Sequence, residues 1–314
     1  MKKTIYAIAM MLITSVASFA QAEDAKVILQ SGANTTIYDG NSLSTAIGAA
    51  KKGDIIYLSE GIYSGFTIDK EILVRGVGEK SYVKGDITIA IPDNPTLTTH
   101  IIEGVWASGA LNITKPATDM IIRSCKFSGD LNVSAALPNG LIDRCFIDGT
   151  VILNTYTNTV TIKNSKVRHI LGASASNNQC FFKNCNVWCH KDYNKKETTA
   201  AKFENCILAS NDEWHYSEMT RCLMNSSYIE ETTITTNCYK ENSGGSTFLD
   251  ETSLEAKYDL ASKDYLGTDG TIIGVYGGTT PFTLDPQVAK VTESSFTVDT
   301  TTKKLTVKLK VAAQ

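Results

Sequence analysis

The sequence predicts an all-β fold, a parallel β-helix in which short strands stack coil upon coil. Three observations support this prediction. Residues 120 to 228 repeat every 20 or 21 residues, a period typical of stacked architectures. Each copy carries two apolar columns, with a column of Cys or Ser between them. A polar column rich in Asn precedes the Cys or Ser column in every copy.

The repeat is defined by four columns of residues. The Cys or Ser column comprises Cys125, Cys145, Ser165, Cys185, Cys206 and Ser226. The polar column comprises Ser124, Arg144, Asn164, Asn184, Asn205 and Asn225. The apolar column three positions before the cysteines comprises Ile122, Ile142, Ile162, Phe182, Phe203 and Leu223. The apolar column two positions after them comprises Phe127, Ile147, Val167, Val187, Leu208 and Tyr228.

The polar column predicts a sharp bend in every coil. The first apolar residue and the cysteine are three positions apart, whereas a straight strand places same-face residues two apart. Asn tolerates left-handed backbone angles and can bond its own backbone or the equivalent Asn one copy along. We therefore expect two short strands per coil, joined by a stacked turn. Coils running from about residue 53 to about residue 275 would number about ten, at roughly 4.8 Å per coil.

A short helix is predicted before the first coil. Leu43, Ile47 and Ala50 share one helical face, and Asn41 or Ser42 can cap its start. We expect this helix to plug the open end of the stack, because an uncovered end would expose strand edges and an apolar floor.

The bend with its Asn column resembles the right-handed β-helix of the pectin-lyase-like superfamily, in which an asparagine ladder lines the short turn. The segment NSLSTAIGAAKKGDIIYLSEGIYSGFTIDKEILVRGVG, residues 41–78, resembles the start of that fold. The segment DGTIIGVYGGTTPFTLDP, residues 269–286, resembles the closing part of secreted β-helix proteins from Bacteroidetes-type bacteria, most of which have no assigned reaction. This resemblance implies a tight final turn at Gly274, Gly277 and Gly278, with the tail covering the last coil.

The chain is predicted to be exported and to divide into three parts. Residues 1–22 have the charged start, short apolar stretch and small residues of a secretory signal peptide, with cleavage after Ala22 or after Ala20. Residues 23–280 form the β-helix with its cap, and residues 281–314 form a C-terminal β tail of alternating apolar and polar residues. The destination is the periplasm, the cell surface or the medium, and no transmembrane segment remains after cleavage.

Charge and cysteine content limit the partners. Cleavage removes Lys2 and Lys3 and takes the formal net charge from −3 to −5, which disfavours nucleic acid as a partner. The cysteines of the column are predicted to be buried free thiols, because stacked side chains with parallel vectors fit disulfide geometry poorly. The repeat puts Cys180, Cys189, Cys222 and Cys238 off the column, and a disulfide among them stays open.

A binding strip is predicted where long connections of neighbouring coils meet. Its residues are Arg168, His169, Trp188, His190, Asp192, Tyr193, Asp212, Glu213, Trp214, His215 and Tyr216. Aromatic faces beside carboxylates and imidazoles suit a sugar, which offers both an apolar face and hydroxyls. The alternative is that these aromatic residues pack over the coil surface while the charged residues are solvated.

Other sites are less favoured. Cys185, Cys189 and His190 approximate a metal cluster, but Cys185 belongs to the inward column, so no metal and no cofactor are predicted. The outward column Arg123, Asp143, Lys163, Lys183 and Glu204 is interpreted as a solvated face with cross-strand ion pairs, with a catalytic strip as the alternative. The short motifs of pectate lyases and polygalacturonases do not occur in the chain.

The function predicted is therefore glycan binding or another surface interaction by a secreted or surface protein, with a polysaccharide as the partner. A polysaccharide lyase or glycoside hydrolase is the first alternative, and a structural surface spacer is the second. The ligand and the oligomeric state stay open.

Overall fold

A computed structural model describes residues 25–93, 95–96, 100–153, 159–171, 180–190, 201–208, 217–225, 233–241, 248–249, 259–260, 265–284, 290–299 and 304–312. The predicted signal peptide lies outside these residues. Among the residues described, no helix combines the length and apolar character needed to cross a bilayer.

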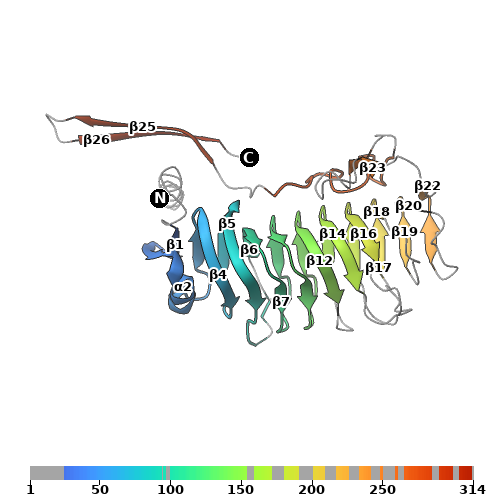
Figure 1. Cartoon of the computed structure of the whole chain (residues 1–314), viewed down its shortest axis with the longest axis horizontal. Coiled ribbons are helices and arrows are strands. Elements are labelled where there is room, and N and C mark those ends of the chain that lie inside the picture. Colours follow the sequence, from blue (N-terminus) through green and yellow to red (C-terminus); the bar gives the residue numbers. More distant parts are fainter. Residues whose placement is uncertain are drawn as a thin grey trace.

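The chain forms a parallel β-solenoid, as the sequence predicts, and Figure 1 shows its coils stacked along one axis. The first sheet contains β3 (Ile55–Leu58), the start of β5 (Leu73–Ile89), β6 (His100–Ala107), β8 (Ile121–Arg123), β11 (Leu141–Asp143), β13 (Thr161–Lys163), β15 (Cys180–Lys183), β17 (Ala201–Glu204), β19 (Glu218–Thr220) and β21 (Ile234–Thr236). Neighbouring strands of this sheet pair in parallel and nearly always in register with the repeat.

Two further sheets close each coil. The second sheet contains the start of β4 (Gly61–Ile68), the middle of β5, the end of β6, β9 (Lys126–Phe127), β12 (Phe146–Leu153), β14 (Lys166–Leu171), β16 (Asn186–His190), β18 (Ile207–Leu208), β20 (Leu223–Asn225) and β22 (Tyr239–Glu241). The third sheet contains the ends of β4, β5, β12, β14 and β16, together with β7 (Leu111–Ile113) and β10 (Leu131–Val133).

About seven complete coils form, fewer than the ten or so expected, because among the described residues the third sheet receives strands from only seven of the ten coils that supply the first and second sheets. The expectation assumed a uniform repeat as far as residue 275. The coil from Val74 to its partner Ile102 is longer than the repeat, and residues 265–284 add no coil.

The predicted bend is confirmed at the polar column. Its residues adopt left-handed backbone angles with φ between 45° and 55°, namely Ser124, Arg144, Asn164, Asn184, Asn205, Arg221 and Asn237. Consecutive turns are joined through the backbone, for example from Asn164 N to the carbonyl oxygen of Lys183 at 3.0 Å. The last copy differs from the predicted alignment, because the coil that follows Cys206 is shorter than the repeat. Its turn is therefore occupied by Arg221 and not by Asn225.

The cysteine column is confirmed as part of the core. Cys125, Cys145, Cys185 and Cys206 are fully buried, and Ser165 takes the same place in its coil. The shortened coil also brings Cys222 and Cys238 onto this column, contrary to their predicted position off it. All seven cysteines whose side chains the structure describes are free thiols.

The helix α2 (Leu43–Ala49) follows the 3-10 helix η2 (Gly40–Ser42) and buries Leu43, Ala46 and Ile47 in the core at the N-terminal end. Ser42 occupies the N-cap position, but its side chain bonds Asn41 and makes no cap hydrogen bond. Strands β1 (Lys26–Ser31) and β2 (Asn34–Asp39) extend the first sheet by antiparallel pairing next to the cap.

Residues 265–284 form a segment, here called the strap, that runs back along the turns (Figure 1). Asn164 Nδ2 donates to the carbonyl oxygens of Val275 and Gly277, at 3.1 and 2.8 Å. Gly274 N donates to the carbonyl oxygen of Asn205 at 2.7 Å. The glycines of the predicted final turn therefore lie against middle coils, where the turn column offers them hydrogen-bond partners.

The strap also covers outward residues of the second sheet. Ile273 packs on Ile207 and Leu223, and the ammonium of buried Lys166 lies 5.2 Å from the ring centre of Phe282 and 5.6 Å from that of Tyr276. The remaining strands form two antiparallel pairs, β23 (Phe248–Leu249) with β24 (Asp259–Leu260) and β25 (Lys290–Asp299) with β26 (Lys304–Ala312).

Candidate functional site

The outward side of the second sheet, here called the second-sheet face, carries the most varied side chains. Its inward residues Val83, Ala107, Phe127, Ile147 and Val167 are at most 1% exposed. Because side chains alternate along a strand, the residues before and after each of these point outward. The preceding column is Tyr82, Trp106, Lys126, Phe146 and Lys166, and the following column is Lys84, Ser108, Ser128, Asp148 and Arg168.

The preceding column contains three aromatic rings and two lysines. The rings of Tyr82 and Trp106 meet edge to face at 5.3 Å between centres. The ammonium of Lys126 lies 4.2 Å from the ring centre of Trp106 and 5.3 Å from that of Phe146, and it also approaches Glu79 at 3.7 Å. These contacts stabilise the ammonium of Lys126 and restrict the half-buried indole of Trp106.

Polar groups line the following column. The Trp106 Nε1 group donates to Ser128 Oγ at 3.5 Å. Arg168 Nη1 lies 3.2 Å from Asp148 Oδ1, and these side chains are 43% and 24% exposed, so both keep polar atoms accessible to solvent. A ligand could therefore exchange hydrogen bonds with the pair without entering the core.

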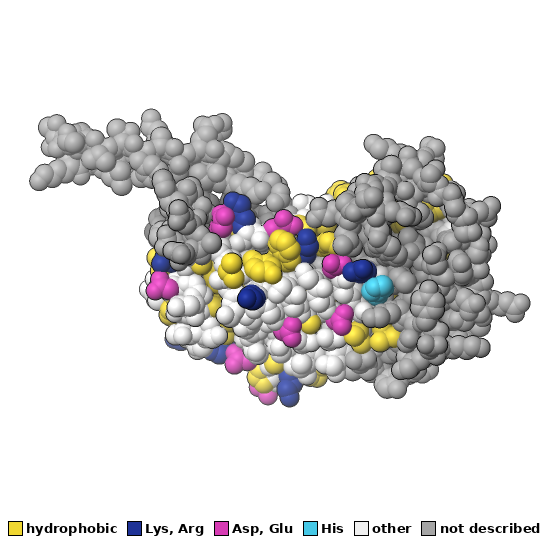
Figure 2. Space-filling view, viewed as in Figure 1, with side chains coloured by type: hydrophobic (Ala, Val, Ile, Leu, Met, Phe, Trp, Pro, Cys, Tyr) yellow, Lys and Arg dark blue, Asp and Glu magenta, His cyan; other side chains and the backbone are white. Residues whose placement is uncertain are grey.

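A second carboxylate, Asp130, and an imidazole, His169, are connected to the residues that flank this ion pair along the chain. Thr150 N donates to Asp130 Oδ1 at 2.7 Å, and Thr150 is the register partner of His169. Figure 2 shows acidic, basic and histidine side chains gathered over the middle coils, beside hydrophobic side chains. The face thus combines an aromatic edge, hydroxyls, carboxylates and a guanidinium.

The structure places four of the predicted strip residues, all of them in strands instead of in connections. Arg168 and His169 lie in β14, and Trp188 and His190 lie in β16. Lys166 and Val167 pair with Asn186 and Val187, so the positions of Arg168 and Trp188 are adjacent on neighbouring strands. His190 is the register partner of the buried Ile170, which separates its position from that of Arg168. The other predicted residues, Asp192, Tyr193, Asp212, Glu213, Trp214, His215 and Tyr216, lie outside the described residues.

Several residues of this face were not predicted from the sequence. They are Trp106, Lys126, Ser128, Asp130 and Asp148. A signal for them exists, because YVKGD, WASGA, KFSGD and FIDGT align on a column of glycines, Gly85, Gly109, Gly129 and Gly149. At Gly149 a Cβ atom would meet the backbone of Gly129, so this column needs glycine for close stacking.

The outward column of the first sheet carries ion pairs, as predicted. Arg123 Nε lies 3.1 Å from Asp143 Oδ2, and Lys183 Nζ lies 3.0 Å from Glu204 Oε1. The column is not fully solvated, however, since Asp143 is only 4% exposed. Arg144 Nε also approaches Asp143 Oδ2 at 3.3 Å, so this carboxylate is held between two guanidinium groups.

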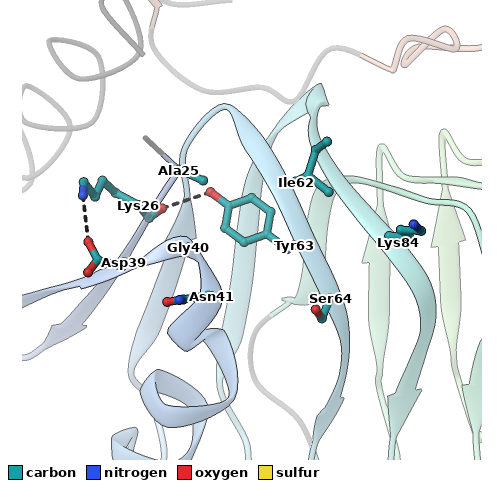
Figure 3. Close-up of a pocket in the computed structure, with 9 residues that line it drawn as sticks. All are labelled: Ala25, Lys26, Asp39, Gly40, Asn41, Ile62, Tyr63, Ser64 and Lys84. Atoms are coloured by element: carbon teal, nitrogen blue, oxygen red, sulfur yellow. Dashed lines mark hydrogen bonds and ion pairs between the residues drawn. The ribbon is translucent and has the colours of Figure 1, made fainter. Parts of the chain in front are cut away.

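A cavity of about 490 Å³ lies beside the cap (Figure 3). Lys26 Nζ and Asp39 Oδ1 form an ion pair at 2.8 Å on its wall. Tyr63 donates from its hydroxyl to the carbonyl oxygen of Lys26 at 3.0 Å, and burial raises the pKa of Tyr63 to about 12. Lys26, Asp39 and Tyr63 thus bond one another across this wall. The second-sheet face therefore remains the stronger candidate for a ligand-binding site.

Among the side chains described, no group of three or more His, Cys, Asp or Glu is arranged to hold a metal ion. Searches of protein-family models, curated proteins and solved structures found no match to the chain. The class that fold and face define is a parallel β-solenoid with a mixed aromatic and polar outer surface.

Proposed function

We propose that this protein is an exported right-handed β-helix of the pectin-lyase-like type that binds a glycan along its second-sheet face. The observation that carries the proposal is a row of four outward side chains, Trp106, Ser128, Asp148 and Arg168. They come from successive coils, whose strands lie roughly 4.8 Å apart. A polymer extended along the stack axis would meet a new polar group at each coil. Hydroxyl, carboxylate and guanidinium groups form hydrogen bonds with sugar hydroxyls, and an indole ring packs on the apolar face of a sugar ring.

Export and a location at the cell surface are supported by the sequence. Residues 1–22 have the composition of a signal peptide, and residues 269–286 resemble secreted β-helix proteins of Bacteroidetes-type bacteria. An extracellular glycan would be accessible to such a protein.

Binding can be measured calorimetrically on a panel of neutral and uronate-containing polysaccharides. Trp106→Ala and Arg168→Ala should each weaken binding about tenfold, equivalent to about 1.4 kcal/mol. Lys202→Ala is the matched control, because Lys202 forms a comparably exposed ion pair with Glu218 at 3.0 Å on the first sheet. Equal losses in all three variants, or no binding to any polysaccharide, would contradict the proposed site.

A lyase or hydrolase is the second candidate, favoured by the Asp148–Arg168 ion pair and by the nearby positions of His169, which follows Arg168, and Asp130, which bonds Thr150. In an enzyme, His169→Ala should lower turnover about a hundredfold or more while binding persists. Product release from the same panel distinguishes the two classes. If neither binding nor products are found, the protein is better described as a surface spacer.

A further inference from the structure

The described part of the sheet ends at an uncovered strand edge. Strand β2 pairs antiparallel with β1, and β1 pairs on its other side with β3. No other described strand pairs with β2. Five of its six residues are exposed, and Ile37 is 52% exposed. Every second residue of such an edge directs its backbone N–H and C=O groups away from the sheet.

The neighbouring strand β4 shows how this protein covers an edge elsewhere. Helices η2 and α2 lie against β4 at the cap. A Cβ atom at Gly61, the first residue of β4, would overlap the Cβ of Ala25. The chain therefore packs closely over the start of β4, whereas no described strand other than β1 pairs with β2.

Strand β2 also lacks the features that keep edges apart. Its sequence NTTIYD contains no proline and no lysine, and all six residues pair continuously with β1 without a bulge. Thr, Ile and Tyr favour strands. Its single charge, Asp39, is paired with Lys26 at 2.8 Å. The edge is thus flat, nearly neutral and competent for pairing.

We propose that β2 pairs antiparallel with β2 of a second copy of this chain, so that two solenoids join at their capped ends about a two-fold axis. A two-fold axis brings the same edge of both copies together, so the pairing is self-complementary. With the register centred on Ile37, the two exposed isoleucines bury each other, and Asp39 of one copy faces Thr35 of the other. No like charges meet in this register.

The short strand sets the strength of the dimer. Six residues on each side form a small interface, which is typical of weak, reversible association. The proposal is independent of glycan binding, because β2 lies at the cap and the second-sheet face lies along the coils.

Sedimentation velocity of the purified protein over a wide concentration range tests the dimer. A reversible monomer–dimer equilibrium is expected, and Ile37→Lys should weaken it about tenfold or more by placing two cations opposite each other. Ile62→Lys is the matched control, because Ile62 is 57% exposed on β4 and should leave the equilibrium unchanged. Both substitutions are on exposed side chains, and thermal melting verifies that the variants fold.

A cysteine variant reports the geometry directly. Ile37→Cys should give a dimer linked by disulfide under mild oxidation, while Ile62→Cys should not. A wild-type protein that stays monomeric at all concentrations would overturn the proposal. A dimer that Ile37→Lys leaves intact, or that both lysine variants weaken equally, would overturn it too.

Discussion

Asn205 and Thr268 form a reciprocal pair across 63 residues of sequence. Thr268 N donates to Asn205 Oδ1 at 2.8 Å, and Asn205 Nδ2 donates to Thr268 Oγ1 at 3.3 Å. The Asn205 side-chain amide therefore forms hydrogen bonds with the strap, whereas the sequence predicts bonds with the Asn of a neighbouring coil. Asn184 lies between Asn164 and Asn205 in the same column. Its Oδ1 and Nδ2 atoms have no described hydrogen-bond partner.

This difference predicts unequal effects of two similar substitutions. Asn205→Leu should lower the free energy of unfolding by about 2 to 4 kcal/mol, because it places Leu at a left-handed angle and removes hydrogen bonds to the strap. Asn184→Leu should cost about 1 to 2 kcal/mol, because it has the same angle but no described hydrogen bond to lose. Urea denaturation measures both. Equal losses would show that the strap contacts contribute little.

The coils could be predicted because each copy repeats the same local physics. An inward cysteine, a left-handed polar residue and apolar neighbours recur, so errors in one copy are corrected by the others. The alignment failed only where the coil shortens, at Arg221 and Cys222. The strap could not be predicted in place, because its contacts with Asn164 and Asn205 are non-local and follow no period.

The candidate site was only partly predictable for a related reason. Arg168, His169 and Trp188 stood out by residue type, but whether they lie in strands or in connections depends on where each strand ends. Asp148 and Ser128 are common residue types whose importance comes from their register with Arg168 and Trp106. That register became visible only once the coils were superposed through their glycines.

The buried thiols should be protected from alkylation in the native protein. Burial raises the pKa of the Cys145, Cys206 and Cys222 thiols, so little reactive thiolate forms and reagents have no access. Cys238 is less buried and should react first, although its hydrogen bond with Cys222 and its burial raise its pKa. Mass spectrometry with peptide mapping after timed labelling measures the order and separates these residues from Cys189. Fast native labelling of Cys206 would contradict the inward column.

The strap should detach when Gly277 gains a side chain. A Cβ atom there would overlap the carbonyl oxygen of Ile272 and lie 2.7 Å from Asn184 Nδ2, so Gly277→Ala should cost about 1 to 3 kcal/mol and expose the strap to protease. Gly270→Ala is the control, because that position has φ of +75° but no atom within 4 Å of the added Cβ. It should cost only about 1 to 2 kcal/mol and keep the strap protected. Equal protease resistance of both variants would argue against tight docking at Gly277.

Stability should fall in alkaline solution through Tyr63. Burial raises its pKa to about 12 from an ordinary value of 10.0, so the folded protein keeps the phenol proton where the unfolded chain has lost it. The contribution is complete below pH 10 and is lost as the pH rises from 10 toward 12, which amounts to about 2 to 3 kcal/mol.

Tyr63→Phe removes this pH dependence. It also removes the hydrogen bonds to the carbonyl oxygens of Lys26 and Ser59, each 3.0 Å long, and should be less stable at neutral pH by about 1 to 2 kcal/mol. Urea denaturation of both proteins between pH 8 and pH 12 should therefore give stability curves that converge above pH 10; parallel curves would mean that the Tyr63 hydroxyl ionises as readily in the folded protein as in the unfolded chain.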